Sequence, residues 1–222
     1  FQNVITQFDD NVEFLFGDDN SEDKTKDEIY SLIKNQEKDR ARIKFYEGPG
    51  ICKSENVYKG IHYASNEIIV ILDADLTVKI SDMKMALDAF IESDIDFLNC
   101  TRLIYPRSEK SMKKSNFLGN ILFANFFSII FKQKITDTLC GTKVFYKKDF
   151  LRFEKYNGTW GIKDKWGDFD LLLGAYQINL KIREYPVSYE DRIEGDTKMT
   201  NVFLNGLRML YIIINGFIKI RF

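Results

Sequence analysis

Two aspartates one residue apart, Asp73 and Asp75, are the residues of this chain best suited to chemistry. They follow an apolar, mostly β-branched run at positions 68–72, which is typical of a strand buried on both faces of a parallel sheet. Open α/β sheets bind ligands beyond the carboxyl ends of such strands. Both carboxylates can lean to one side there, and they repel each other unless a cation lies between them. The pattern therefore favours a hard divalent cation, Mg²⁺ or Mn²⁺, and Mg²⁺ usually brings a phosphate with it.

The structural alternative is that these aspartates only cap a helix or occupy a solvated turn, where Asp is common. A second acidic pair supports the metal interpretation, because Asp18 and Asp19 follow another short apolar segment at positions 13–16. The carboxyl ends of parallel strands share one edge of a sheet. We therefore expect the two acidic pairs to converge on one crevice.

An anionic ligand in that crevice would also need positive groups. Lys53 begins a predicted helix after a glycine-broken loop, and Arg102 follows a predicted strand. Arg192, Thr197 and Lys198 surround a flexible glycine, a combination that suits a phosphate clamp. Taken singly, each cation is more often a solvated surface residue than a ligand-binding one.

Asp168 and Asp170 stand at the start of an apolar helix predicted to run to about residue 178. One of them is expected to be the helix cap, with Asp168 slightly favoured. The other is a candidate general base that would take a proton from an acceptor hydroxyl. A phosphate acceptor is already ionised, and the aspartate would then orient the acceptor or assist the metal. Which of the two acts as base is left open.

Length and composition restrict the class of protein. The 222 residues suffice for one domain, with or without an appendage, and a formal net charge of −1 predicts no nucleic-acid partner. Three widely spaced cysteines indicate a reducing compartment, and a single histidine, His62, argues against zinc or histidine chemistry. We expect a cytoplasmic protein.

The periodicity of apolar residues predicts an α/β protein with a doubly wound, mostly parallel sheet. Strands are expected at 13–16, 42–46, 67–72, 95–100, 143–146 and 181–185. Helices are expected at 25–38, 53–64, 81–93, 117–131, 167–178 and from 201 onwards. Ser21 or Asp23 should cap the first of these helices. The apolar segments 117–131 and 209–222 should be core helices, with a place on a membrane surface as the alternative.

In order, these segments resemble the family-2 glycosyltransferases, which have the GT-A nucleotide-sugar-binding fold. Residues 18–25 are similar to that family's nucleoside-holding Asp-Asp-Gly-Ser-x-Asp-x-Thr turn, with Asn20 in place of the glycine. Asp73-Ala74-Asp75 resembles its metal-binding Asp-x-Asp, and residues 50–60 resemble its Gly-Lys-Gly-x-Ala stretch. Residues 137–143, residues 192–198 and the pair Phe169-Asp170 resemble motifs of the branch that makes polyprenyl-phosphate sugars.

The resemblance implies an inverting sugar transfer from a UDP- or GDP-sugar with Mg²⁺ or Mn²⁺. Asp73 and Asp75 would hold the metal, and Asp75 would count as catalytic together with Asp168 and Asp170. The metal and the cations would neutralise the departing diphosphate. The nucleotide sugar would be bound by Asp18, Asp19, Lys53, Asp73 and Arg102, and the acceptor phosphate by Arg192, Thr197 and Lys198.

The resemblance also implies a GT-A domain at 1–200, with a nucleotide-binding half to about 101 and an acceptor half at 102–200. Residues 201–222 would form an apolar terminal helix, with a peripheral position on the inner face of the membrane left open. The family's first central strand, ending in Pro-x-x-Asn-Glu, is not found in the sequence. We expect an incomplete chain rather than a variant fold, since its loss would leave two strand edges unpaired.

Several alternatives remain open at this point. The acceptor is expected to be a polyprenyl phosphate, with a polysaccharide or a small hydroxylated molecule as the second choice. A nucleotidyltransferase on a related sheet is another possible enzyme class. The non-enzymatic alternative is a sugar-nucleotide-binding domain that has lost catalysis, against which the intact Asp73 and Asp75 argue.

Overall fold

The computed structural model describes residues 2–9, 11–35, 42–106, 112, 114–190 and 201–221. The chain forms two compact units, each described by itself. The first comprises Phe1–Ile69 with Lys165–Gly167, and the second comprises Val70–Asp164 with Asp168–Phe222.

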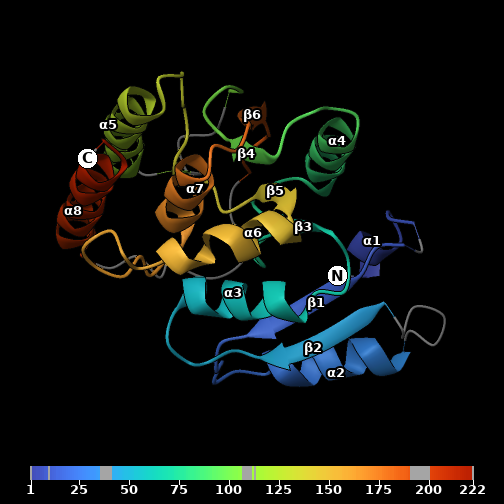
Figure 1. Ribbon diagram of the computed structural model, residues 1–222. Helices are drawn as coiled ribbons and strands as arrows, with labels where there is room; N and C mark the ends of the chain where they lie inside the picture. Colours follow the sequence, from blue (N-terminus) through green and yellow to red (C-terminus); the bar gives the residue numbers. More distant parts are fainter. Residues whose placement is uncertain are drawn as a thin grey trace. The chain divides into compact units, whose positions relative to one another are not determined.

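The first unit is a β-α-β arrangement with two further helices. β1 (Phe14–Asp18) and β2 (Ile43–Glu47) pair in parallel, and α2 (Thr25–Asn35) lies between them in the chain (Figure 1). The predicted cap is confirmed for Asp23, whose carboxylate accepts the Thr25 backbone N–H at 2.9 Å. The further helices are α1 (Gln2–Ile5) and α3 (Lys53–Tyr63).

A buried tyrosine, Tyr46, packs between the strands and α3 of this unit. The Tyr46 side chain lies against Gly17 of β1 and Gly60 of α3, and a Cβ at either glycine would overlap it. Its hydroxyl donates to the Asn56 carbonyl oxygen at 2.9 Å. Burial, with the nearby Asp19 charge, raises the pKa of Tyr46 to about 12, so this hydroxyl stays a donor at neutral pH.

The second unit contains most of a four-stranded sheet in the order β3-β5-β4-β6, with β3 entering it from Val70 onwards. The central strand β4 is buried over its whole length, and it pairs in parallel with β6 and antiparallel with β5. Pro186, which has no N–H to donate, ends β6 at the edge of the sheet. The strands are β3 (Ile68–Ile71), β4 (Phe97–Thr101), β5 (Lys143–Tyr146) and β6 (Ile182–Pro186).

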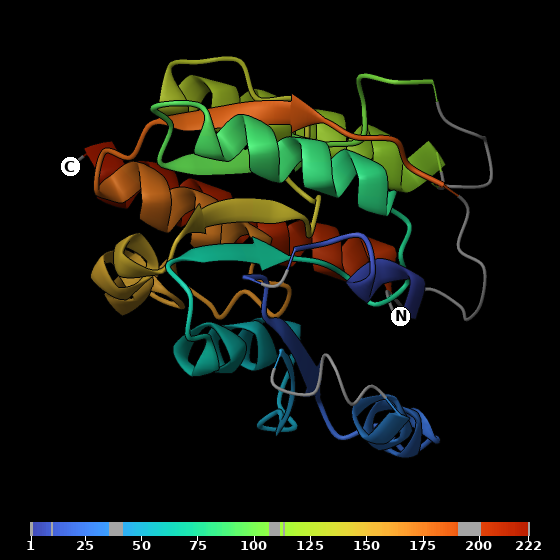
Figure 2. The ribbon, with the colours of Figure 1, turned by 90° about the vertical axis from the view of Figure 1, so that its right-hand side faces the viewer.

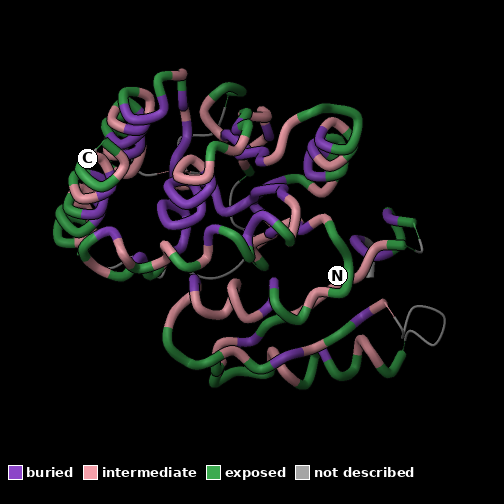
Figure 3. The backbone as a smooth tube through the Cα atoms, viewed as in Figure 1, coloured by how far each residue is buried: buried purple, intermediate pink, exposed green. Residues whose placement is uncertain are grey.

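Helices cover both sides of this sheet. α4 (Ile80–Ile91) lies on one side, and α5 (Lys114–Phe131), α7 (Asp168–Gln177) and α8 (Val202–Arg221) lie on the other (Figures 1 and 2). Aromatic rings fill the core between α5 and α7, where the Phe169 ring lies 5.7 Å from that of Phe123 and 5.0 Å from that of Phe127. Buried residues accordingly concentrate at the centre of this unit (Figure 3).

The predicted α/β class is confirmed, and every predicted strand is present to within two residues at each end. Sequence analysis missed α6 (Lys147–Phe153), which follows β5 directly, because seven residues are too few to show a helical period. The two compact units divide near residue 70. The boundary between a nucleotide-binding and an acceptor half was placed from the sequence at about residue 101, and this functional boundary remains a prediction.

We expect Gly60→Ala to lower the free energy of unfolding by about 1–3 kcal/mol, because the new methyl group would overlap the Tyr46 hydroxyl. Adding Tyr46→Phe should restore part of the loss by removing that oxygen. Urea denaturation measures both effects. Gly119→Ala is the matched control, since Gly119 is also helical and nothing lies within 4 Å of its added Cβ. An equal loss at both glycines would contradict this packing.

Candidate functional site

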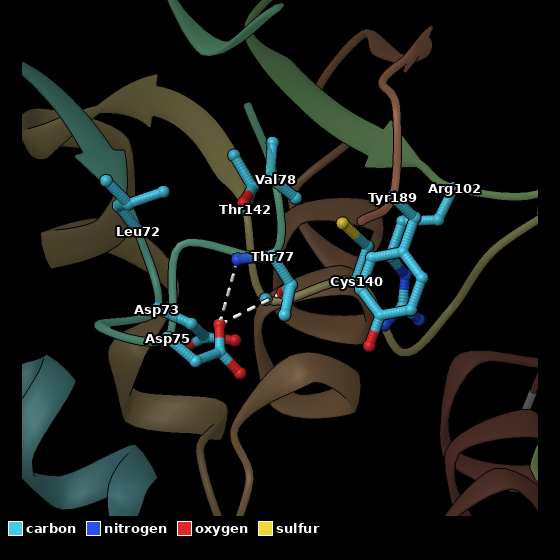
Figure 4. A pocket seen from close by; sticks show the side chains of 10 residues that line it. Leu72, Asp73, Asp75, Thr77, Val78, Arg102, Cys140, Thr142 and Tyr189 are labelled. Carbon is cyan, nitrogen blue, oxygen red and sulfur yellow. Dashed lines mark hydrogen bonds between the residues drawn. The ribbon is translucent and has the colours of Figure 1, made fainter. Parts of the chain in front are cut away.

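A pocket in the second unit contains both aspartates of the Asp-x-Asp turn (Figure 4). Its walls come from the turn after β3, the end of β4, the segment before β5 and the segment after β6. Because β5 is antiparallel to β4, its amino end lies at the same sheet edge as the carboxyl ends of β4 and β6. The lining residues are Leu72, Asp73, Asp75, Thr77, Val78, Arg102, Cys140, Gly141, Thr142 and Tyr189.

The turn after β3 orients Asp75. Its Oδ1 atom accepts the Thr77 hydroxyl at 3.0 Å and the Thr77 backbone N–H at 3.3 Å. Leu76 has a positive φ of 50° and donates its N–H to the Asp73 carbonyl oxygen at 3.2 Å. Val78 then forms a β-bridge with Tyr189. Both carboxylates consequently lie at the same end of the pocket (Figure 4).

Arg102 lines the opposite end of the pocket and forms a buried ion pair with Asp137. Its Nε and Nη2 atoms donate to the two carboxylate oxygens at 2.7 and 2.9 Å, and its backbone N–H donates at 3.0 Å. The guanidinium also lies 5.0 Å from the Tyr189 ring centroid. Burial alone would raise the pKa of Asp137, but the Arg102 charge and hydrogen bonds outweigh it and lower the pKa to about 2.

Asp137 is further held by its neighbours. Asn120 Nδ2 donates to its Oδ1 at 2.6 Å, and its own N–H donates to Glu184 at 3.1 Å. Glu184 also accepts from the backbone and hydroxyl of Thr136, and its burial raises its pKa. β4, α5 and β6 thus all contribute to fixing the start of segment 137–143.

A second buried ion pair fixes the end of the same segment. The Lys143 side chain is fully buried, and its Nζ donates to Asp168 Oδ1 at 2.8 Å. The same Nζ also donates to the Cys140 carbonyl oxygen. Residues 140–142 form the pocket wall next to this lysine. Burial raises the pKa of Cys140 to about 11, which argues against a thiolate nucleophile in that wall.

The two candidate bases have other partners. Asp168 is paired with Lys143, and Asp170 accepts the Gly158 N–H at 3.1 and 3.2 Å. The favoured capping role of Asp168 is wrong, because Asp164 accepts the backbone N–H groups of Phe169 and Asp170 at 2.9 and 3.3 Å. Asp164 precedes the helix by four residues, beyond the usual capping position. Neither Asp168 nor Asp170 lines the pocket.

The predicted nucleotide-binding residues Asp18, Asp19 and Lys53 belong to the first unit. The Asp18 carboxylate is buried and accepts the Ser21 N–H at 3.1 Å, whereas Asp19 accepts the Gly50 N–H at 2.8 Å. Lys53 begins α3, as expected. The convergence of these acids with Asp73 and Asp75 stays a prediction. Arg192, Thr197 and Lys198 lie outside the described residues.

The oxygen atoms of Asp73 and Asp75 suit a hard divalent cation. In the part of the chain that the structure describes, no group of three or more His, Cys, Asp or Glu could hold a metal by itself. Mg²⁺, however, is commonly held by one or two carboxylates and completes its shell with water and substrate phosphates. The two aspartates therefore fit Mg²⁺ or Mn²⁺ if a phosphate ligand supplies further oxygens.

Sequence analysis found the acids of this site but missed the residues that hold them. Thr77 could have been identified, because a hydroxyl residue two positions after an aspartate commonly closes such a turn. Tyr189 carries no such local signal. The pairing of Arg102 with Asp137 and of Lys143 with Asp168 was missed because it joins residues far apart in the chain.

The sheet, its covering helices and the pocket at the strand ends define an α/β protein of the GT-A class. The family model described as glycosyl transferase family 2 matches residues 1–153. The chain therefore belongs to this family, as its motifs predicted.

Among similar proteins, a dolichyl-phosphate beta-glucosyltransferase of Trichomonas vaginalis is 26% identical over 199 residues. This match covers 84% of the chain and 58% of that protein, so the chain spans less than two thirds of this relative. This chain is therefore close in sequence to the dolichyl-phosphate branch of the family.

Solved structures support the fold. Glucosyl-3-phosphoglycerate synthase from Mycobacterium tuberculosis, in complex with Mn²⁺, UDP and glucosyl-3-phosphoglycerate, has a TM-score of 0.61 and 10% identity, covering 92% of this chain and 68% of that one. S. aureus TarS 1-349 has a TM-score of 0.56 and 16% identity, covering 99% and 67%.

We expect Lys143→Met to lower the free energy of unfolding by about 3–5 kcal/mol, because Asp168 would keep its buried charge without a partner. Removing both charges with Lys143→Met and Asp168→Asn should cost less than the sum of the single changes. Lys181→Met is the control, since it breaks an exposed pair with Asp94 and should cost little. Urea denaturation giving equal losses for both lysines would contradict a buried pair.

The pH dependence of stability should reveal the Arg102–Asp137 pair. Because the folded-state pKa of Asp137 is lowered, its stabilising contribution is complete above its unfolded value of about 3.9 and is lost as pH falls toward 2. In Arg102→Met, burial should instead raise this pKa, so the variant should lose most stability relative to wild type near neutral pH and least near pH 3. Unfolding free energies measured from pH 3 to 7 check this, and a constant difference would contradict it.

Proposed function

We propose that the chain is the catalytic part of a metal-dependent, inverting glycosyltransferase that moves a sugar from a UDP- or GDP-sugar to a polyprenyl phosphate. The observation that carries this proposal is the pocket that Asp73, Asp75 and Arg102 share at the ligand-binding edge of the sheet. Family membership supports the reaction class. Similarity to a dolichyl-phosphate beta-glucosyltransferase supports the acceptor class.

Asp73 and Asp75 would hold Mg²⁺ or Mn²⁺ together with the donor diphosphate. Such a cation would neutralise the charge that develops on the departing diphosphate. The Thr77 hydrogen bonds hold Asp75 in place before any ligand arrives, so little reorganisation accompanies binding. The similar glucosyl-3-phosphoglycerate synthase was solved with Mn²⁺ and UDP, which supports this combination of metal and nucleotide.

The first unit would bind the nucleoside and diphosphate of the donor. Asp19 joins the turn after β1 to the loop after β2 through the Gly50 N–H, so both loops are held in one arrangement. Asp18 stabilises its own turn through Ser21, and Lys53 adds a positive charge at the start of α3. Arg102 is a further candidate for binding a phosphate of the donor.

The surroundings of Asp168 and Asp170 favour a phosphate acceptor over a hydroxyl acceptor. Asp168 is paired with a fully buried lysine, and Asp170, 1% exposed, accepts a backbone N–H. A general base must reach the proton that it removes. A phosphate acceptor is already ionised and needs no such base, so both aspartates can serve as positioning groups near the acceptor.

We further propose that Arg192, Thr197 and Lys198 clamp the acceptor phosphate by charge-assisted hydrogen bonds. Polyprenyl phosphates are membrane lipids, so the protein would act from the cytoplasm as a peripheral protein on the inner face of the membrane.

Donor binding can be tested by thermal denaturation with UDP and Mn²⁺. A ligand at 100 times its Kd stabilises a protein by about 2.7 kcal/mol, so the melting temperature should rise by several degrees. Asp75→Asn should remove the Mn²⁺-dependent part of this rise, and Thr77→Val should reduce it. Asp88→Asn, an exposed change on α4, is the control. A Mn²⁺-dependent rise unchanged in Asp75→Asn would contradict the metal role.

The reaction itself is tested by incubating the protein with UDP- and GDP-sugars, with and without a short-chain polyprenyl phosphate. Metal-dependent transfer to the lipid phosphate supports the proposal. Transfer only to hydroxyl acceptors would contradict the acceptor while leaving a transferase. Failure to bind or hydrolyse any nucleotide sugar would favour a non-catalytic domain.

A further inference from the structure

Two neighbouring helices of the second unit, α5 and α8, each expose a stripe of apolar side chains, which in α5 is interrupted by the exposed Asn125. The outer stripe of α8 recurs every three or four residues and so occupies one side of the helix. Its members, between 48% and 81% exposed, are Phe203, Leu204, Leu207, Tyr211, Ile214 and Ile218. A surface helix of a globular protein normally places polar residues on this side.

α5, which packs beside α8, repeats the pattern (Figures 1 and 3). Its inner side, with Phe123 and Phe127, contacts the Phe169 ring of α7. Its outer stripe, between 38% and 65% exposed, consists of Leu118, Ile121, Leu122 and Ile129. The two outer stripes together form what we call the α5–α8 face.

The charged residues on α5, on α8 and directly after α5 are all basic. Neither α5 nor α8 contains an Asp or Glu, although the chain carries 33 acidic residues in 222. Arg208, Lys219 and Arg221 lie on α8, and Lys132 and Lys134 directly follow α5 with exposed side chains. The face thus combines exposed apolar side chains with positive charge and no acid on either helix.

We propose that the α5–α8 face docks on an anionic lipid bilayer, with both helices lying in the plane of the membrane interface. Apolar side chains would enter the acyl boundary, and the cations would meet lipid headgroups. This inference rests on the proposed function in one respect, since a membrane-embedded acceptor makes such docking useful. The charge pattern and the exposed stripes support it independently.

The packing of α8 argues against a membrane-spanning position. By length and composition α8 could cross a membrane, but Met209, Ile212 and Ile213 on its inner side are almost completely buried. Gly216 lies so close to Leu173 of α7 that an added Cβ would overlap that side chain. A spanning helix would have to leave these contacts.

The charges argue against a second copy of the chain as the occupant. A symmetric dimer brings the same surface of both copies together. At the α5–α8 face this would place cations near cations without acids on these helices to compensate them. Anionic headgroups supply the missing negative charge.

Vesicle co-sedimentation tests the proposal. The wild-type chain should bind vesicles of phosphatidylcholine with phosphatidylglycerol more tightly than pure phosphatidylcholine vesicles, and added salt should weaken binding. Leu207→Glu on α8 and Leu122→Glu on α5 should each weaken binding at least about tenfold, because each places a charge in the apolar stripe. Met85→Glu is the matched control, since Met85 is an equally exposed apolar residue on α4, and it should bind as the wild type does.

Several results would overturn the docking. These are equal binding by wild type, Leu207→Glu and Leu122→Glu, no preference for anionic lipid, or retention of the chain in membranes after alkaline carbonate extraction. Concentration-dependent dimers that Leu207→Glu abolishes, without vesicle binding, would assign the face to a second copy. The UDP–Mn²⁺ melting shift keeps the two proposals separate, because it should be unchanged in Leu207→Glu. If the wild-type chain binds vesicles but shows no UDP–Mn²⁺ melting shift, only the proposed function is refuted.

Discussion

Two buried ion pairs, one at each end of segment 137–143, hold the pocket together. Asp137 binds Arg102 at the end of β4, and Lys143 binds Asp168 at the start of α7. Removing one partner of such a pair leaves the other charge buried and unpaired, which lowers the free energy of unfolding by several kcal/mol. The pocket wall at residues 140–142 is therefore fixed between the central strand and α7, and it cannot shift without breaking one of the pairs.

The same helix, α7, connects this wall to the outer surface of the second unit. Asp168 at its start binds Lys143, Phe169 packs on the rings of α5, and Leu173 meets Gly216 of α8. Because these side chains are closely packed, a displacement of one of these helices would also move its neighbours. A membrane contact at the α5–α8 face would accordingly hold the pocket at a set distance from the lipid.

Local patterns predicted local features well. The strands were recognised from their apolar runs, and the Asp-x-Asp turn from its place after one of them. The cap of α2 was found because Asp23 lies only two residues before Thr25, the first residue of the helix. The cap of α7 was assigned wrongly because Asp164 reaches back into the helix from four residues away, a geometry that no simple spacing rule describes.

The sequence by itself determined the family, the α/β class and the pair of acids at the end of β3, since each depends on residues close together in the chain. Only the tertiary structure decided which charges neutralise one another. Arg102 and Asp137 are 35 positions apart, and Lys143 and Asp168 are 25 apart. It also decided which side of α5 and α8 stays exposed, because both helices carry apolar residues on more than one side and burial depends on the neighbours that each one packs against.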